Sequence, residues 1–177
     1  MIREARVKGV EADFRVMDML EIGQRLEPGF GLIFCIGNSI VHLESERRIA
    51  EVLRACYGLL SPGGRLVVQI INYDRILAER ILELPALSNA ERGLEFFRWY
   101  DYEENSETVQ FRTELRVEER GKIQRISNRA PLWILKKAAL ERLTREAGFK
   151  ASELLGGFGG QPYGPESLPL ILCAARE

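Results

Sequence analysis

The order of hydrophobic and polar positions in the first half of the chain predicts strands alternating with a helix. The apolar runs Leu32–Ile36 and Leu66–Ile71 are typical of parallel strands that are covered on both faces. Between them, apolar residues recur every three or four positions from Ser45 to Leu60, which predicts an amphipathic helix with Ser45 as its N-cap. Phe14–Met17 alternates and predicts a short strand that finishes at Asp18. This order indicates an α/β fold.

The pattern changes to a period of two from Gly93 onward, which predicts an antiparallel meander within residues 93–131. Its strands are expected over 96–102, 108–118 and 122–130, with reversals at Asn105-Ser106 and Arg120-Gly121. The remaining expected elements are a helix over 1–8 ended by Gly9, helices over 75–84 and 136–147, and strands over 150–155 and 168–175. We therefore expect one domain over residues 1–177 that contains the meander.

Composition narrows the function classes. A chain of 177 residues with a net charge of -1 gives no electrostatic reason to expect nucleic acid or an anionic membrane as partner. The three cysteines, Cys35, Cys56 and Cys173, have no paired spacing and are expected to be thiols in a reducing cytoplasm. With His42 as the single histidine, a His-rich zinc site is excluded, and we expect no metal. No apolar run reaches membrane-spanning length, so we expect a cytoplasmic protein.

Polar residues follow directly after the expected strands. Asp18 follows the first, Gly37-Asn38-Ser39 the second, and Asn72-Tyr73 the third. Open α/β sheets bind ligands outside the carboxyl ends of their strands, and a glycine there permits close backbone approach. The alternative is local: Asp18 caps the next segment, and Asn38 and Ser39 belong to a tight turn. Both interpretations stay open at this point.

Several motifs occur in an order that resembles a known family. They are Met1–Arg6, Phe14–Met19, Phe30–Ser39 with His42-Leu43, Leu59–Leu66 around Pro62-Gly63-Gly64, Asn72–Leu77, and Leu140–Phe149. Together they resemble class I S-adenosylmethionine-dependent methyltransferases, nearest to the small-molecule glycine and sarcosine N-methyltransferases. The resemblance implies a Rossmann-like sheet with the antiparallel meander inserted. The acid and arginine that precede Asn-Tyr-Asp in the glycine enzymes are replaced here by Gln69-Ile70-Ile71, so glycine specificity is not implied.

The resemblance also implies roles for individual residues. Cofactor contacts are expected from Asp18, Met19, Cys35, Gly37 and Asn38, with Asp18 at the adenine amino group. Contacts to the methyl acceptor are expected from Ser39, Arg112 and Tyr163. Catalytic positions are expected at His42, Asn72 and Tyr73. His42 has a structural alternative on its loop, and the meander arginines have one as a solvated face. The run Gly156–Gly160 neither follows a first strand nor opens a helix, so it is not a dinucleotide loop.

In the family, the sheet order is three-two-one-four-five-seven-six. The resemblance therefore implies that the first two strands and their Gly-rich turn would precede residue 1, which leaves Leu32–Ile36 as an apolar edge. The strand at Phe14 could pair with that edge, a second chain could cover it, or the sequence is a shortened one. We expect weak or absent S-adenosylmethionine binding by the isolated chain, and a homodimer or a partner chain that completes the sheet.

Two functional hypotheses follow. The first is methyl transfer from S-adenosylmethionine to a small molecule, an amine or a carboxylate-bearing acceptor, with the activity of this chain alone left open. The second is a non-catalytic, methyltransferase-like module that dimerises or binds a partner through its exposed sheet edge. A nicotinamide enzyme has no support, because the chain lacks its Gly-rich fingerprint.

Overall fold

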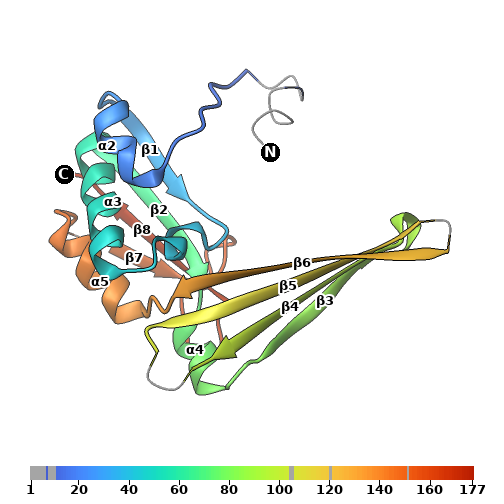
Figure 1. Cartoon of the computed structure of the whole chain (residues 1–177). Helices are drawn as coiled ribbons and strands as arrows, with labels where there is room; N and C mark the ends of the chain where they lie inside the picture. Colours follow the sequence, from blue (N-terminus) through green and yellow to red (C-terminus); the bar gives the residue numbers. More distant parts are fainter. Residues whose placement is uncertain (1–6, 8–10, 104–105, 120, 151) are drawn as a thin grey trace.

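The computed structural model describes residues 7, 11–103, 106–119, 121–150 and 152–177. Within these residues the strands form two four-stranded sheets, one mixed and one antiparallel (Figure 1). The helix expected over 1–8 with its end at Gly9 lies outside the described residues except for position 7, and the reversals at Asn105-Ser106 and Arg120-Gly121 are only partly described.

The mixed sheet has the strand order β1-β2-β8-β7. Its strands are β1 (Phe30–Cys35), β2 (Leu60–Ile71), β7 (Ser152–Leu155) and β8 (Pro169–Ala175). β1 runs parallel to β2, whereas β8 is antiparallel to both β2 and β7. This order confirms the four-five-seven-six part of the expected sheet.

Three helices lie on one face of this sheet: α2 (Ile22–Arg25), α3 (Glu46–Leu59) and α5 (Lys137–Glu146) (Figure 1). α3 confirms the predicted amphipathic helix, and the Ser45 hydroxyl caps it by accepting a hydrogen bond from the backbone N–H of Arg48 at 3.3 Å. α5 confirms the helix predicted over 136–147. The chain leaves α5 through Gly148, whose φ of +114° is accessible mainly to glycine.

The two faces of the mixed sheet differ in burial. Leu66, Val68 and Ile70 of β2 point toward the helices and are fully buried. On the opposite face, Leu32 is 53% exposed and Phe34 is 63% exposed. The prediction that β1 is covered on both faces was therefore wrong, because among the described residues the helices that pack on the sheet lie on one side of it. We call the uncovered side the open face.

The antiparallel sheet is the predicted meander with one additional strand. It consists of β3 (Glu83–Asn89), β4 (Leu94–Tyr102), β5 (Thr108–Glu119) and β6 (Lys122–Trp133), in that order. The helix predicted over 75–84 is shorter, since α4 spans Tyr73–Ala78 and the chain then turns at Arg80, whose φ is +49°. β3 was not predicted, and its edge position explains how it tolerates Pro85.

Short 3-10 helices connect these elements, and those in the described residues are η1 (Met19–Glu21), η2 (Ser39–Leu43) and η3 (Ala90–Arg92). The base of the meander packs on the rest of the molecule, because Tyr100, Val109 and Leu132 share a buried cluster with Ile40 of η2 and Tyr73 of α4. Its far end extends away from the mixed sheet (Figure 1).

The strand predicted at Phe14–Met17 was wrong. Residues 11–18 carry no regular secondary structure, and Val16 is 83% exposed. A strand of four residues is stable only when it is paired, and in the described part of the chain β1 pairs with β2 alone.

Candidate functional site

The carboxyl ends of β1 and β2 meet at one edge of the mixed sheet, and the turn after β1 is tied to β2. The backbone N–H of Gly37 donates to the Gln69 side-chain oxygen at 2.7 Å, and the N–H of Asn38 donates to the Gln69 carbonyl at 3.2 Å. Gly37 has a φ of +76° and Asn38 a φ of +63°, so two successive residues adopt the left-handed conformation. The Gly37 position holds open space: a Cβ there would meet only the Ser39 hydroxyl oxygen, at 3.9 Å.

The Asn38 side chain links the two strand ends. Its oxygen accepts a hydrogen bond from the Ile71 N–H at 3.2 Å, and its Nδ2 donates to the Tyr73 hydroxyl at 3.1 Å. Tyr73 is only 1% exposed, and this burial raises the pKa of its hydroxyl. In this arrangement Tyr73 positions Asn38.

Asn72 is a buried junction between β2 and the loop that precedes β8. Its Nδ2 donates to the carbonyl oxygens of Pro165 and Ser167, and its Oδ1 accepts from the Arg75 N–H and, at 2.9 Å, from the Tyr163 hydroxyl. All four hydrogen-bonding positions of this amide are used, and the residue is 1% exposed. The structure thus brings Asn72 and Tyr163 together, as parts of one network.

Gln69 is the site residue that the sequence reasoning noted only as a departure from the glycine enzymes. It holds the Gly37-Asn38 turn through both its side chain and its backbone carbonyl. The available signal was a polar amide inside an otherwise apolar strand. Such a residue needs a hydrogen-bond partner, and the next strand end is within reach.

The remaining predicted cofactor and catalytic residues in this part of the chain lie at η1, at the end of β1 and on η2. Asp18 is the N-cap of η1 and accepts a hydrogen bond from the Leu20 N–H at 2.9 Å, while Met19 packs against the core from the same short helix. Cys35 ends β1, and burial raises the pKa of its thiol. Ser39 donates to the Ile36 carbonyl at 2.8 Å. His42 is exposed on η2, and no hydrogen bond joins it to another described residue.

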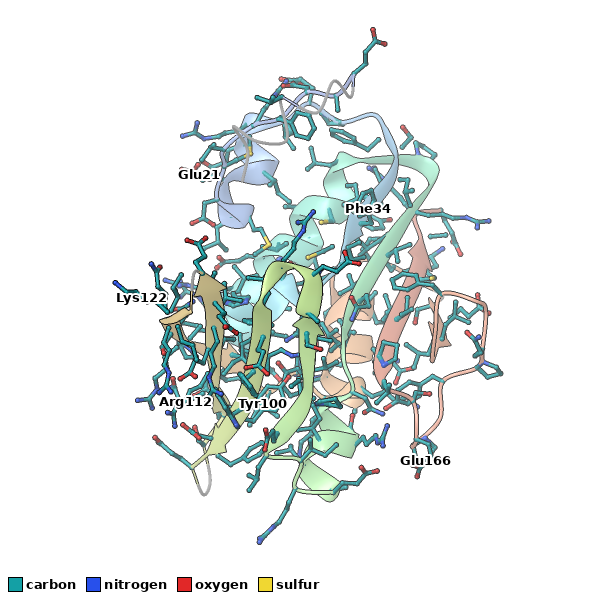
Figure 2. The ribbon with its side chains drawn as sticks, turned by 90° about the vertical axis from the view of Figure 1, so that its right-hand side faces the viewer. Glu21, Phe34, Tyr100, Arg112, Lys122 and Glu166 are labelled. Atoms are coloured by element: carbon teal, nitrogen blue, oxygen red, sulfur yellow. The ribbon has the colours of Figure 1, made fainter. Side chains whose placement is uncertain are left out.

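Arg112 lies on the outer face of the meander. Successive strand residues alternate between faces, so Arg112 and its partner Trp99 point away from the side on which Tyr100 is buried. Arg112 pairs with Asp101 at 3.3 Å and lines an 810 Å³ depression together with Trp99 and Arg129. Figure 2 shows Arg112 on the meander and Phe34 on the mixed sheet. The structure therefore does not bring Arg112 to the Gly37-Asn38 turn.

The inner face of the meander carries a different polar row. Arg98, Thr113 and Asn128 are direct cross-strand neighbours on the side that also holds Tyr100. Arg98 donates to the Pro85 carbonyl at 2.8 Å, while its buried Nε has no hydrogen-bond partner among the described residues. A second cavity of about 790 Å³ is lined by Leu77, Tyr102 and Trp133 among others, and none of the predicted site residues lines it.

Two features of the described residues fit what S-adenosylmethionine would require. The open space at Gly37 and the ordered backbone of the turn fit a ligand that passes close to the strand ends. Asp18 keeps an exposed carboxylate that can accept from an amino group. Among the described residues, no cluster of three or more His, Cys, Asp or Glu side chains could hold a metal ion, and no helix is long and apolar enough to cross a membrane.

Comparisons with known proteins agree with this geometry. No family model matches the sequence. The glycine/sarcosine/dimethylglycine N-methyltransferase of Actinopolyspora halophila is 28% identical over 181 residues, which cover 95% of this chain and 27% of that protein. The chain thus spans about a quarter of the length of the curated relatives it matches.

Solved structures show the same fold. DesVI from Streptomyces venezuelae superposes with a TM-score of 0.80 at 18% identity, covering 99% of this chain and 70% of that one. CalS10, an amino pentose methyltransferase from Micromonospora echinaspora solved with S-adenosylmethionine bound, gives a TM-score of 0.63 at 17% identity, covering 98% of this chain and 68% of that one. The chain has the fold of class I S-adenosylmethionine-dependent methyltransferases. It is a distant homologue of the glycine and sarcosine N-methyltransferases.

Proposed function

We propose that this chain carries the acceptor side of an S-adenosylmethionine-dependent methyltransferase that acts on a small molecule. The observation that supports this most is the Gly37-Asn38 turn, which is held by Gln69, Ile71 and Tyr73 and leaves open space beside Gly37. When bound, the cofactor supplies the methyl group. Transfer to a neutral amine needs mainly orientation, which a turn fixed by hydrogen bonds can provide.

The residues that would hold the cofactor are Asp18 and Met19 at the adenine and Gly37 and Asn38 near the methionine part. For the acceptor, we favour an amine or a carboxylate-bearing molecule. Arg98 is better placed than Arg112 to meet a carboxylate, because it lies on the inner face of the meander and its buried Nε has no hydrogen-bond partner within the described part of the chain.

We further propose that the outer edge of β1 is where the first two strands of the family's sheet, and with them part of the cofactor site, would lie. In the described part of the chain β1 pairs on one side only. The isolated chain should therefore bind S-adenosylmethionine weakly, with a dissociation constant in the range of about 1 mM.

Saturation-transfer NMR with S-adenosylhomocysteine tests this proposal. We expect transfer from the chain to the adenine and ribose protons, and loss of that transfer in Gly37→Val, which fills the open space. Gly121→Val is the matched control, since Gly121 also has a positive φ and open surroundings but lies at the far end of the meander. Absence of transfer, or equal transfer in both variants, would contradict the proposed site. Micromolar affinity of the isolated chain would contradict the proposal that part of the cofactor site lies outside the described residues.

The second candidate function is a non-catalytic module that associates through its sheet edge. It is favoured by the apolar side chains that β1 exposes. Methyl transfer from isotopically labelled S-adenosylmethionine to any small amine or carboxylate by this chain would contradict that reading.

A further inference from the structure

The outer face of the meander separates its charges by strand. Two cross-strand rows, each with one residue from every strand between β3 and β6, are Glu83, Trp99, Arg112 and Arg129, and Ser88, Glu95, Arg116 and Arg125. In both rows β5 and β6 hold arginines, whereas the acid stands on β3 or β4. Directly opposite residues share a face of the sheet. The outer face is therefore acidic and aromatic on its β3–β4 half and basic along β6.

The charges at the two sides of this face are not balanced within the described part of the chain. Arg112 lies directly opposite Arg129, and Arg116 directly opposite Arg125. Like charges in such positions destabilise a sheet unless a counter-charge is near. The two β5 arginines pair with acids of their own sheet. Among the described residues no ion pair forms at Arg125, Arg129 or Glu83, and all three are exposed.

An aromatic pair stands between the acidic and the basic side. The rings of Phe97 and Trp99 stack with their centroids 5.9 Å apart and an angle of 9° between their planes, and both side chains are half-buried. The Arg116 guanidinium lies 4.3 Å from the centroid of the Phe97 ring. Trp99 also lines the depression of about 810 Å³ together with Arg112 and Arg129. Tryptophan and arginine are the residue types that most often dominate the binding energy of protein interfaces.

The charge pattern indicates what covers this face. If the outer faces of two copies pack about a two-fold axis parallel to the strands, β3 of one copy lies over β6 of the other, and β4 lies over β5. Glu83 then faces Arg129 of the second copy, and Trp99 faces Arg112 of the second copy. Face-to-face sheets keep their strands aligned within about 30°, which preserves these rows. A two-fold axis across the strands would instead bring the arginines of the two β6 strands together, which like charges disfavour.

We propose that two copies of this chain associate through the outer faces of their meanders, with β3 over β6. The same patch serves both copies, so the contact closes as a dimer. It uses only residues of β3 to β6 and therefore requires neither methyl transfer nor the edge of β1. The Gly37-Asn38 turn and the inner face of the meander stay free in this dimer.

Sedimentation of the whole chain from about 1 to about 200 µM tests the proposal, because a two-fold dimer forms with rising protein concentration. Arg129→Glu should raise the dimer dissociation constant at least about tenfold, since each dimer then holds two contacts between Glu83 and a second acid. Glu83→Arg should weaken the dimer by a similar factor, because it opposes two arginines. The double variant exchanges the two charges and should return the constant to within about threefold of the unaltered chain.

The variants do not threaten the fold, since both residues are exposed and Arg129→Glu removes a like charge opposite Arg112. Phe34→Glu is the matched control, because it alters an exposed residue on the mixed sheet and should leave the constant unchanged within about threefold. A monomer throughout the concentration range, open-ended association, disruption by Phe34→Glu, or a double variant as weak as the single ones would overturn the proposal. No cofactor is required, so the result is independent of the S-adenosylhomocysteine experiment.

Discussion

The two faces of the mixed sheet are built from the same strands but differ in what covers them. On the helix side, Ile33 of β1 neighbours Leu66 of β2, and Leu66 is fully buried beneath α3. On the open side, Phe34 neighbours Val67, and Phe34 is mostly exposed. Both faces of β1 are apolar, so hydrophobicity alone does not distinguish them. The difference teaches that an apolar strand shows which surfaces can be buried, while the neighbouring elements decide which ones are.

Thiol reactivity should show the largest difference between the faces. Cys56 packs on the helix side, where burial raises its pKa to about 12, and the nearby Cys35 thiol adds to the rise. Cys173 lies on the open side in the same cross-strand row as Phe34 and Val67. At about pH 8, a pKa near 12 rather than 9.0 leaves Cys56 about a thousandth of the thiolate of an ordinary cysteine. Burial raises the pKa of Cys173 as well, so the ratio of thiolate between the two is smaller than this. Alkylation followed by peptide mapping should still show Cys173 reacting at least about tenfold faster than the fully packed Cys56.

The raised pKa of the Cys56 thiol also affects the free energy of unfolding. A thiol whose pKa is raised on folding keeps its proton longer in the folded state, so its contribution is complete below its ordinary pKa of 9.0 and is lost as the pH rises through about 12. Tyr100, whose pKa burial raises to about 12, acts in the same direction. Urea unfolding should show decreasing stability over this range, with a shallower decrease in Cys56→Ala. For the alkylation experiment, equal rates at Cys56 and Cys173 would contradict the prediction, because they would show that the two faces of the sheet are equally accessible.

Core truncation should separate the faces by a smaller but still large amount. Leu66→Ala removes a fully buried side chain on the helix side and should cost about 2–5 kcal/mol of unfolding free energy. Leu32→Ala makes the same chemical change on the open side and should cost less than about 1 kcal/mol. Urea unfolding at concentrations where sedimentation shows a monomer provides the measurement. Similar losses for both variants would mean that another element covers the open face in solution.

The sequence predicts the fold best where an element satisfies itself locally. Helix α3 matched its prediction closely because its apolar stripe and its Ser45 cap lie within the segment itself. The meander strands matched because two-residue alternation reports one covered face. The strand predicted at Phe14–Met17 was wrong because strand formation depends on a partner strand, which local alternation does not reveal.

The candidate site was predictable in position and less so in detail. Strand ends followed by Gly37-Asn38 and Asn72-Tyr73 predicted that these residues meet at one edge of the sheet, and the structure joins Asn38 to Tyr73 there. What the pattern could not show is that Tyr73 and Asn72 are buried and joined to Asn38 and Tyr163, since those contacts connect residues up to 91 positions apart. The face on which Arg112 lies depends on strand register, which a one-residue shift would reverse.

The boundary between the covered and the open part of the sheet provides the last test. Asn72 stands at the end of β2, where its amide holds the loop before β8 through three hydrogen bonds and caps α4 through a fourth, from the Arg75 N–H. Asn72→Ala should lower the unfolding free energy by about 2–3 kcal/mol, because it leaves buried partners without hydrogen bonds. Tyr163→Phe removes one of these bonds and should cost about 1 kcal/mol.

Asn128→Ala is the control for the Asn72 substitution, since Asn128 is an exposed asparagine on the meander and its loss should change stability by less than about 0.5 kcal/mol. If Asn72 and Tyr163 act as one network, the double variant should lose less than the sum of the two single losses. Strict additivity in urea unfolding would show that the hydroxyl and the amide act independently. In that case Tyr163 would be free to turn toward a ligand at the strand ends without weakening the loop.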